Sequence, residues 1–128
     1  MILDSSALVA ILRAEQGSDR FLEIVVNTET THLSAGTLLE TSIVVGQDWH
    51  APLDEFLSTS GSTVVPFDET QARHAREAYA RFGKGSGSPA RLNFGDCFSY
   101  ALAKTTGLPL LFKGDDFTHT DVVSALSR

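Results

Sequence analysis

The 128-residue chain has a single cysteine and no hydrophobic run long enough to cross a membrane. One cysteine, Cys97, excludes a disulfide framework within the chain, which is typical of proteins from a reducing compartment. No basic segment with a cleavage site precedes the first apolar residues, so we expect no signal peptide and a cytoplasmic location. The length and a hydrophobic content of 42% predict one domain over residues 1–128, with a core that needs neither disulfides nor a structural metal.

Basic residues are scarce in the first part of the chain and concentrated later. Residues 1–72 hold eleven acidic side chains and only two basic ones, whereas residues 73–113 hold seven basic and two acidic side chains. The net charge of −6 by itself argues against a nucleic-acid partner. A local basic surface is nevertheless typical of proteins that bind a polyanion. A solvated helix face is the commoner reason for such a pattern taken alone.

Short apolar segments alternate with amphipathic ones along the whole chain. This alternation predicts an α/β fold in which a short parallel sheet of four to five strands lies between two layers of helices. We expect strands at residues 1–3, 31–34, 62–67 and 108–112, with a further edge strand at 122–126. We expect helices at residues 5–12, 17–28, 35–49, 51–60, 69–82 and 93–104, the last closed by Gly107.

Acidic residues recur at one predicted edge of this sheet. Asp4 directly follows the first strand, and Asp115 and Asp116 follow the strand at 108–112 by two residues. The carboxyl ends of parallel strands meet at one edge, where open α/β sheets bind ligands. Glu40 and Asp96 each lie near the start of a helix that we expect to begin at the same edge.

Each acid also has a structural explanation. Asp4 is a candidate helix cap, and Asp96 would favour the dipole of its own helix. Asp115 and Asp116 are common turn residues, and Glu40 would suit a solvated helix face. Carboxylates that share a pocket repel one another unless a cation stands among them. Oxygen ligands without histidine or cysteine neighbours select Mg²⁺ or Mn²⁺, which suggests phosphate chemistry.

Four stretches of the chain together resemble a known family. "MILDSSALVAIL", "LLET", "LNFGDCFSYALAK" and "LLFKGDDFTHTDV" are similar, in this order and spacing, to VapC toxins of the PIN-domain fold, and most of all to the mycobacterial branch. The resemblance implies a PIN-domain-like three-layer α/β/α fold. It also implies a Mg²⁺- or Mn²⁺-dependent endoribonuclease that is inhibited by a VapB antitoxin, acts on an RNA substrate and usually forms a homodimer.

The resemblance also assigns roles to individual residues. It makes Asp4 and Asp96 the main metal ligands, with Glu40 and Asp116 binding a second ion or metal-bound water. Asp115 stays open as an alternative to Asp116. Ser6 matches a hydroxyl beside the first acid that orients this acid or a metal-bound water. The expected contacts to the RNA backbone are Lys84, Arg91, Arg81 and Lys113.

Two other functions remain open from the residues. A phosphatase with Asp4 as its nucleophile would need a second aspartate two positions later, where this chain has Ser6. A catalytically silent module that binds an antitoxin or masks RNA would not need the full set of acids. The thiol of Cys97 lies in an apolar setting, which predicts that it is unreactive.

Overall fold

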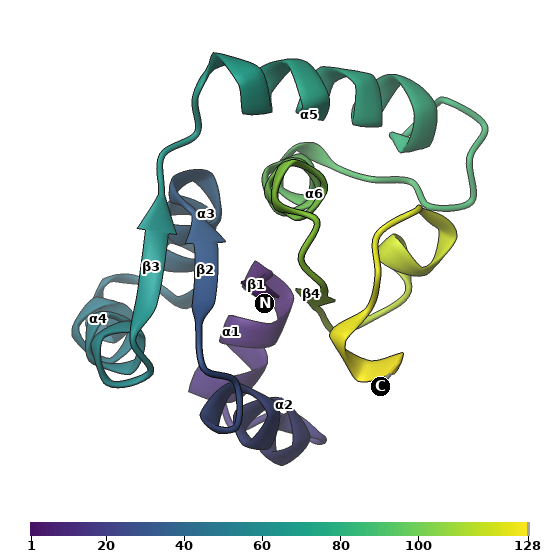
Figure 1. Cartoon of the computed structure of the whole chain (residues 1–128). Helices are drawn as coiled ribbons and strands as arrows, with labels where there is room; N and C mark the ends of the chain where they lie inside the picture. Colours follow the sequence, from purple (N-terminus) through teal and green to yellow (C-terminus); the bar gives the residue numbers. More distant parts are fainter. Residues whose placement is uncertain (128) are drawn as a thin grey trace.

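The sheet is built around the first strand of the chain. In the structure, a computed structural model that describes residues 1–127, β1 (Ile2–Leu3) is a central strand. It pairs in parallel with β2 (Thr31–Ser34) on one side and with β4 (Leu110–Leu111) on the other. β3 (Ser62–Val65) pairs in parallel with β2, which gives the order β3-β2-β1-β4 (Figure 1).

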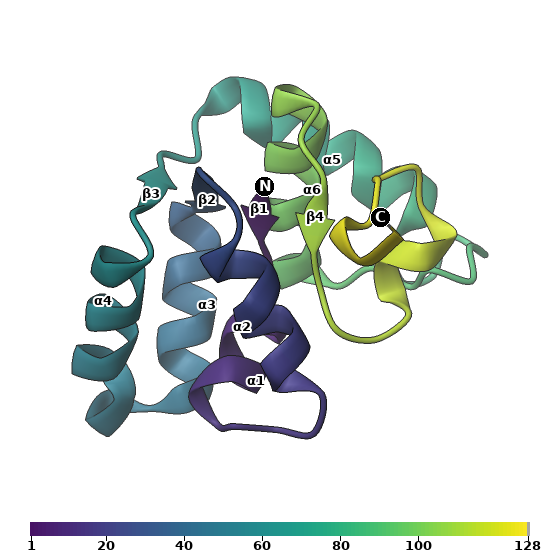
Figure 2. The same cartoon turned by 60° about the horizontal axis from the view of Figure 1, so that its bottom comes forward.

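Helices cover the sheet on both faces, as predicted. Adjacent strand residues point to opposite faces because side chains alternate along a strand. Leu3 therefore joins an apolar cluster with α1, α2 and α4, whereas Ile2 joins a second cluster with α5 and α6. Figure 2 shows α1, α2 and α4 below the strands and α5 above them. The six helices are α1 (Ser5–Leu12), α2 (Ser18–Val26), α3 (Ala35–Val45), α4 (His50–Thr59), α5 (Glu69–Phe82) and α6 (Phe94–Thr106).

The helix termini follow local capping chemistry. The side chain of Asp68 accepts a hydrogen bond from the Gln71 amide and begins α5 at the predicted position. Gly107 has a φ of 71° and ends α6, which is the usual place for a left-handed glycine. The side chain of Asp4 accepts a hydrogen bond from the Ser6 amide and caps α1.

Two predicted elements differ from the structure. The helix expected over 35–49 is α3, which ends at Val45 because Gly46 adopts a φ of 88°; a short 3-10 turn then follows. The edge strand expected over 122–126 does not form. A single parallel bridge joins Leu110 to Ser124, and the chain continues as a 3-10 turn, Ala125–Ser127.

Candidate active site

Asp4 lies at the carboxyl end of the central strand and is only 2% exposed. Its amide donates to the carbonyl oxygen of Leu111, so the two neighbouring strands end together. Its Oδ2 accepts hydrogen bonds from the Ser6 amide at 3.0 Å and the Ser6 hydroxyl at 2.6 Å, and its Oδ1 accepts one from the Ser99 hydroxyl at 2.6 Å. Asp4 is therefore both the cap of α1 and a carboxylate held in one orientation.

Ser6 connects Asp4 to the segment that follows β4. Its hydroxyl oxygen accepts a hydrogen bond from the backbone amide of Lys113 at 2.9 Å while its hydrogen is donated to Asp4. These contacts fix Ser6 between Asp4 and Lys113; its role in orienting the acid or a metal-bound water stays a prediction.

Asp96 occupies the first turn of α6 and is 9% exposed. It forms a capping box with Asn93, in which its Oδ2 accepts from the Asn93 amide at 3.0 Å. Burial raises the pKa of the Asp96 carboxyl to about 7; the Asn93 hydrogen bond opposes this rise, and the nearby charges of Asp4, Asp116 and Glu40 add to it. The capping box thus explains the position of one carboxylate oxygen of Asp96. It does not explain why three other acids lie near this carboxyl.

Glu40 projects from α3 toward α6. Its pKa is raised by burial and by the charge of Asp4, and a hydrogen bond from Ser5 opposes the rise. Its Oε1 is buried and has no hydrogen-bond partner among the described residues. A Cβ atom placed on Gly95 would collide with the Glu40 carboxylate, so the glycine makes room for this group between the two helices.

The burial of Glu40 does not come from an apolar face of α3. Its neighbours Ile43 and Val44 on the same helix are apolar, but their side chains are 71% and 47% exposed. Contact with α6 buries Glu40 instead. This contact depends on Gly95, which sequence periodicity within α3 does not reveal.

The two acids after β4 differ in their surroundings. Both Asp115 and Asp116 are exposed, and Asp116 begins the 3-10 turn Asp116–His119. The charge of Asp116 raises the pKa of Asp96, whereas the charge of Asp115 is not among the causes of this shift. Electrostatic proximity therefore favours Asp116 as the fourth member of the cluster.

The donor set fits a divalent cation. Within residues 1–127, no three or more Asp, Glu, His or Cys side chains are positioned to hold a metal ion as they stand. The charges of Asp4, Asp116 and Glu40 are nevertheless close enough to raise the pKa of Asp96, and Glu40 Oε1 has no hydrogen-bond donor within residues 1–127. A cation among them would offset both the repulsion and the missing contact, and oxygen donors suit Mg²⁺ or Mn²⁺.

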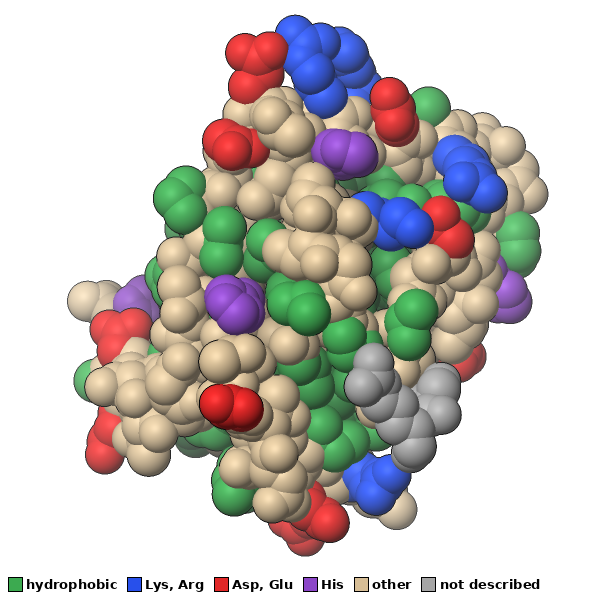
Figure 3. Space-filling view, viewed as in Figure 1, with side chains coloured by type: hydrophobic (Ala, Val, Ile, Leu, Met, Phe, Trp, Pro, Cys, Tyr) green, Lys and Arg blue, Asp and Glu red, His purple; other side chains and the backbone are tan. Residues whose placement is uncertain are grey.

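Basic side chains lie among acidic ones on the surface. Figure 3 shows Lys and Arg side chains gathered toward α5, with Asp and Glu side chains beside them. Among the predicted RNA contacts, Arg81 lies 3.7 Å from Asp121, and Lys113 forms a 2.8 Å ion pair with Glu15. Lys84 and Arg91 are exposed and have no ion pair in the described part of the chain. They line a hollow of about 440 Å³ in the loop before α6.

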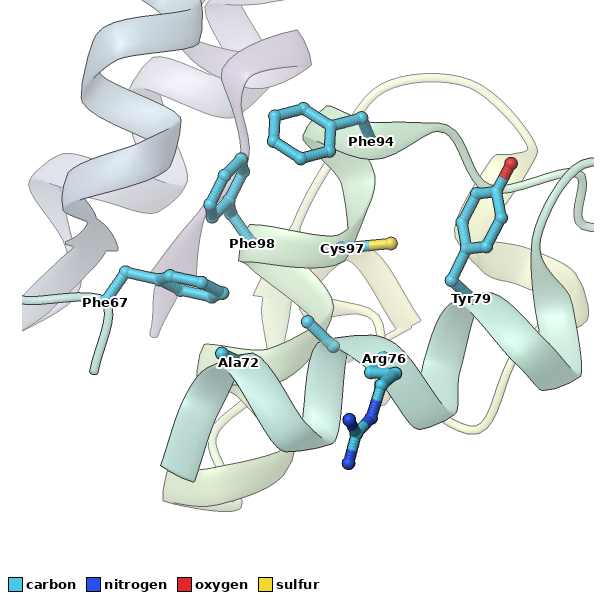
Figure 4. A pocket seen from close by; sticks show the side chains of 8 residues that line it. Phe67, Ala72, Arg76, Tyr79, Phe94, Cys97 and Phe98 are labelled. Atoms are coloured by element: carbon cyan, nitrogen blue, oxygen red, sulfur yellow. The ribbon is translucent and has the colours of Figure 1, made fainter. Parts of the chain in front are cut away.

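An apolar surface adjoins the acids. Most of α6 is buried, but its first residue, Phe94, is 78% exposed. Its ring meets the ring of Phe98 edge to face at a centroid distance of 5.1 Å (Figure 4). These two rings separate a hollow of about 420 Å³ between α5 and α6 from one of about 310 Å³ that includes Glu40.

Cys97 lies beside this aromatic pair and is chemically quiet. Its thiol donates to the backbone oxygen of Asn93 at 3.3 Å, and burial raises its pKa to about 11. At neutral pH the thiol is therefore protonated, in agreement with the prediction that it is unreactive.

Comparison with known proteins identifies the family to which this chain belongs. The PIN domain family matches residues 1–123. Ribonuclease VapC28 from Mycobacterium tuberculosis is 48% identical over 132 residues, with coverage of 100% of this chain and 99% of the relative. Ribonuclease VapC42 from the same species is 44% identical over 126 residues, with coverage of 95% and 96%.

A solved structure agrees on the fold. The crystal structure of Mycobacterium tuberculosis VapC20, described as a sarcin-ricin loop cleaving toxin, superposes with a TM-score of 0.78 at 16% identity and covers 97% of both chains. The fold is therefore that of a PIN domain. At the level of sequence, the chain belongs to the VapC ribonucleases of this family. No helix within residues 1–127 is long and apolar enough to span a bilayer.

Proposed function

We propose that this chain is a toxin that cleaves RNA internally at the cluster of Asp4, Glu40, Asp96 and Asp116, with Mg²⁺ or Mn²⁺ as its cofactor. The observation that supports this most strongly is the raised pKa of Asp96, because it arises from burial together with the charges of the other three acids. A strongly perturbed carboxyl among carboxylates is a common mark of a catalytic site. Membership of the VapC ribonucleases supports RNA as the substrate.

The contacts of each side chain suggest its role in the reaction. A bound divalent cation supplies charge neutralisation at the phosphate and acidification of water. Asp4 and Asp96 are the ligands we assign to it, because hydrogen bonds fix both carboxylates in orientation. Glu40, whose buried Oε1 has no hydrogen-bond partner among the described residues, would bind the cation or a water held by it. Ser6 holds Asp4, and Asp116 takes the remaining position at the exposed side of the cluster.

Lys84 and Arg91 are the residues we assign to the RNA backbone. Both are exposed and without an ion pair among the described residues, and both lie in the loop that leads into Asp96. Arg81 and Lys113, predicted alongside them, already interact with acidic side chains and contribute less. Contacts of this kind hold the strand in place without reading its sequence.

A VapB-type antitoxin is the expected inhibitor. The named relatives are VapC proteins, and a toxin–antitoxin complex from Klebsiella pneumoniae has the same fold, with a TM-score of 0.73 at 16% identity. An inhibitor of this kind acts by covering the acid cluster. Its presence during purification must therefore be excluded in any test of activity.

A homodimer through the apolar surface of α3, α5 and α6 completes the proposal. Phe94 protrudes between two hollows. Two copies related by a two-fold axis could each insert this ring into a hollow of the other. The other exposed apolar side chains of this surface are Leu39, Ile43, Val44 and Tyr79.

The ribonuclease proposal is tested by incubating the purified chain, free of antitoxin, with total cellular RNA. We expect discrete fragments with Mg²⁺ or Mn²⁺, none with EDTA, and none from Asp4→Asn or Asp96→Asn. Asp54→Asn, the same substitution at an exposed position of α4, is the matched control and keeps full activity. Cutting by the Asp4 and Asp96 variants at the wild-type rate would refute the proposed site.

The dimer is tested by sedimentation equilibrium. Phe94→Gln and Ile43→Gln are expected to give folded monomers at concentrations where the wild type is a dimer. Val26→Gln removes an apolar side chain that is 72% exposed on α2 and leaves the dimer intact. Dimers in all three variants would place the interface elsewhere.

A further inference from the structure

Two buried hydroxyl groups lie beneath the acid cluster. Ser99 on α6 and Thr37 on α3 are both 0% exposed, and their oxygens are 3.2 Å apart. The hydroxyl of Ser99 also donates to Asp4 Oδ1 at 2.6 Å. A buried polar side chain requires a hydrogen-bond partner, and here the two hydroxyls and the carboxylate satisfy one another.

The direction of these hydrogen bonds follows from the chemistry of the groups. An ionised carboxylate only accepts, so the single hydrogen of Ser99 goes to Asp4. The oxygen of Ser99 must then accept from the hydroxyl of Thr37. The result is a directed relay from Thr37 through Ser99 to Asp4 that crosses from α3 to α6 to the end of β1.

Each hydroxyl lies one helical turn from an acid on its own helix. Thr37 precedes Glu40 by three residues, and Ser99 follows Asp96 by three residues. Residues three apart share a helix face, so each helix presents an acid and a hydroxyl toward the same place. Asp4 accepts a hydrogen bond from Ser99 directly, and Thr37 is linked to Asp4 through Ser99.

We propose that Ser99 and Thr37 are positioning residues that set the spacing of Asp4, Glu40 and Asp96. The inference rests on the proposed function, because spacing matters through a divalent cation shared by these acids. Side chains that orient metal ligands typically change metal affinity or activity 10- to 100-fold when they are removed. Sequence reasoning overlooked both residues, although their separation of three from an acid is visible in the sequence.

The first test measures Mn²⁺ binding to the whole chain by calorimetry. Ser99→Ala is expected to weaken binding by about 10- to 100-fold, with circular dichroism unchanged. Ser99→Thr keeps the hydroxyl and is expected to restore most of the affinity. Thr37→Val is expected to have a smaller effect alone and little further effect in the Ser99→Ala background, because Thr37 acts through Ser99.

The control removes a different buried hydroxyl contact. Ser62 is paired with the hydroxyl of fully buried Thr31 at 2.6 Å, at the opposite end of β2. Ser62→Ala is expected to lower thermal stability without changing Mn²⁺ affinity. Equal loss of affinity in Ser62→Ala and Ser99→Ala would mean that the effect is one of general stability, and would overturn the proposal.

A crystal structure of the metal-free Ser99→Ala variant tests directly whether Ser99 orients Asp4. We expect the Asp4 carboxylate to rotate away from its wild-type orientation about the Cα–Cβ or Cβ–Cγ bond. An unmoved carboxylate would refute the positioning role. A wild-type chain that neither binds Mn²⁺ nor cuts RNA would instead refute the proposed function, while the orientation of Asp4 in the variant would still settle what Ser99 does.

Discussion

Replacing Asp96 by asparagine is expected to stabilise the metal-free protein while it abolishes activity. In the fold, the pKa of the Asp96 carboxyl is raised from 3.8 to about 7. The metal-free chain therefore loses stability as the pH rises through the interval from about 4 to 7, because the fold disfavours the ionised form. The amide side chain of the Asp96→Asn variant would carry no charge, and its oxygen can still accept from the Asn93 amide.

The size of the effect follows from the pKa difference. Each pKa unit corresponds to about 1.4 kcal/mol, so ionisation of Asp96 at pH 8 costs at most about 4 kcal/mol. Reorganisation and water entry relieve part of this cost, and we expect roughly half of it as the measured gain in the free energy of unfolding. For a chain of this length, that gain corresponds to a rise in Tm on the order of 10 °C.

Urea unfolding in EDTA at pH 8 and at pH 5.5 measures the gain directly. At pH 5.5 the folded carboxyl is largely protonated but the unfolded one is already ionised, so the gain should be about half of that at pH 8. The reasoning is refuted if the gain at pH 8 is absent, or if it is the same at both pH values. Asp54→Asn serves again as the control, since its side chain is exposed and no gain is expected at either pH.

Three further predictions concern the site and its surroundings. Gly95→Ala should displace the Glu40 carboxylate and lower the single-turnover rate of RNA cleavage at least tenfold. Its melting temperature should change little, because the displaced group is the end of a flexible side chain. Asp116→Asn should reduce cleavage strongly and Asp115→Asn only weakly, and equal losses in the same assay would contradict the assignment. Arg91→Ala should weaken RNA binding by an inactive variant and reduce the salt dependence of log Kd by nearly one unit, as a fluorescence titration at several salt concentrations would measure.

The fold could be predicted from the sequence because its strands and helices are punctuated by strong local signals. The helix α5 begins after Asp68, as its sequence predicted, and α6 ends before Gly107. The strand expected over 122–126 failed because the apolar pair Val122–Val123 only passes beside β4, where one bridge forms. Short apolar segments at a sheet edge do not by themselves determine whether a ladder extends.

The acids and Ser6 could be proposed from the sequence, but Gly95, Ser99 and Thr37 could not. The position of Asp4 after a strand is a local signal, whereas the burial of Glu40 depends on Gly95 from a distant helix. The contact of Ser99 with Asp4 spans 95 residues, so no periodicity within either segment indicates it. Long-range contacts of this kind become visible only when the helices have been placed.

The central position of β1 has a consequence for the order in which the protein is made. The first strand to leave the ribosome is flanked in the sheet by β2 and by β4, the last strand of the chain. Loop closure between such distant segments comes late, because the intervening chain must be ordered first. The residues that anchor Asp4, including Ser99 and the Lys113 amide, emerge after most of the chain has been synthesised. A nascent chain thus carries Asp4 throughout translation without the residues that anchor it, and the proposed site is complete only near the end of synthesis.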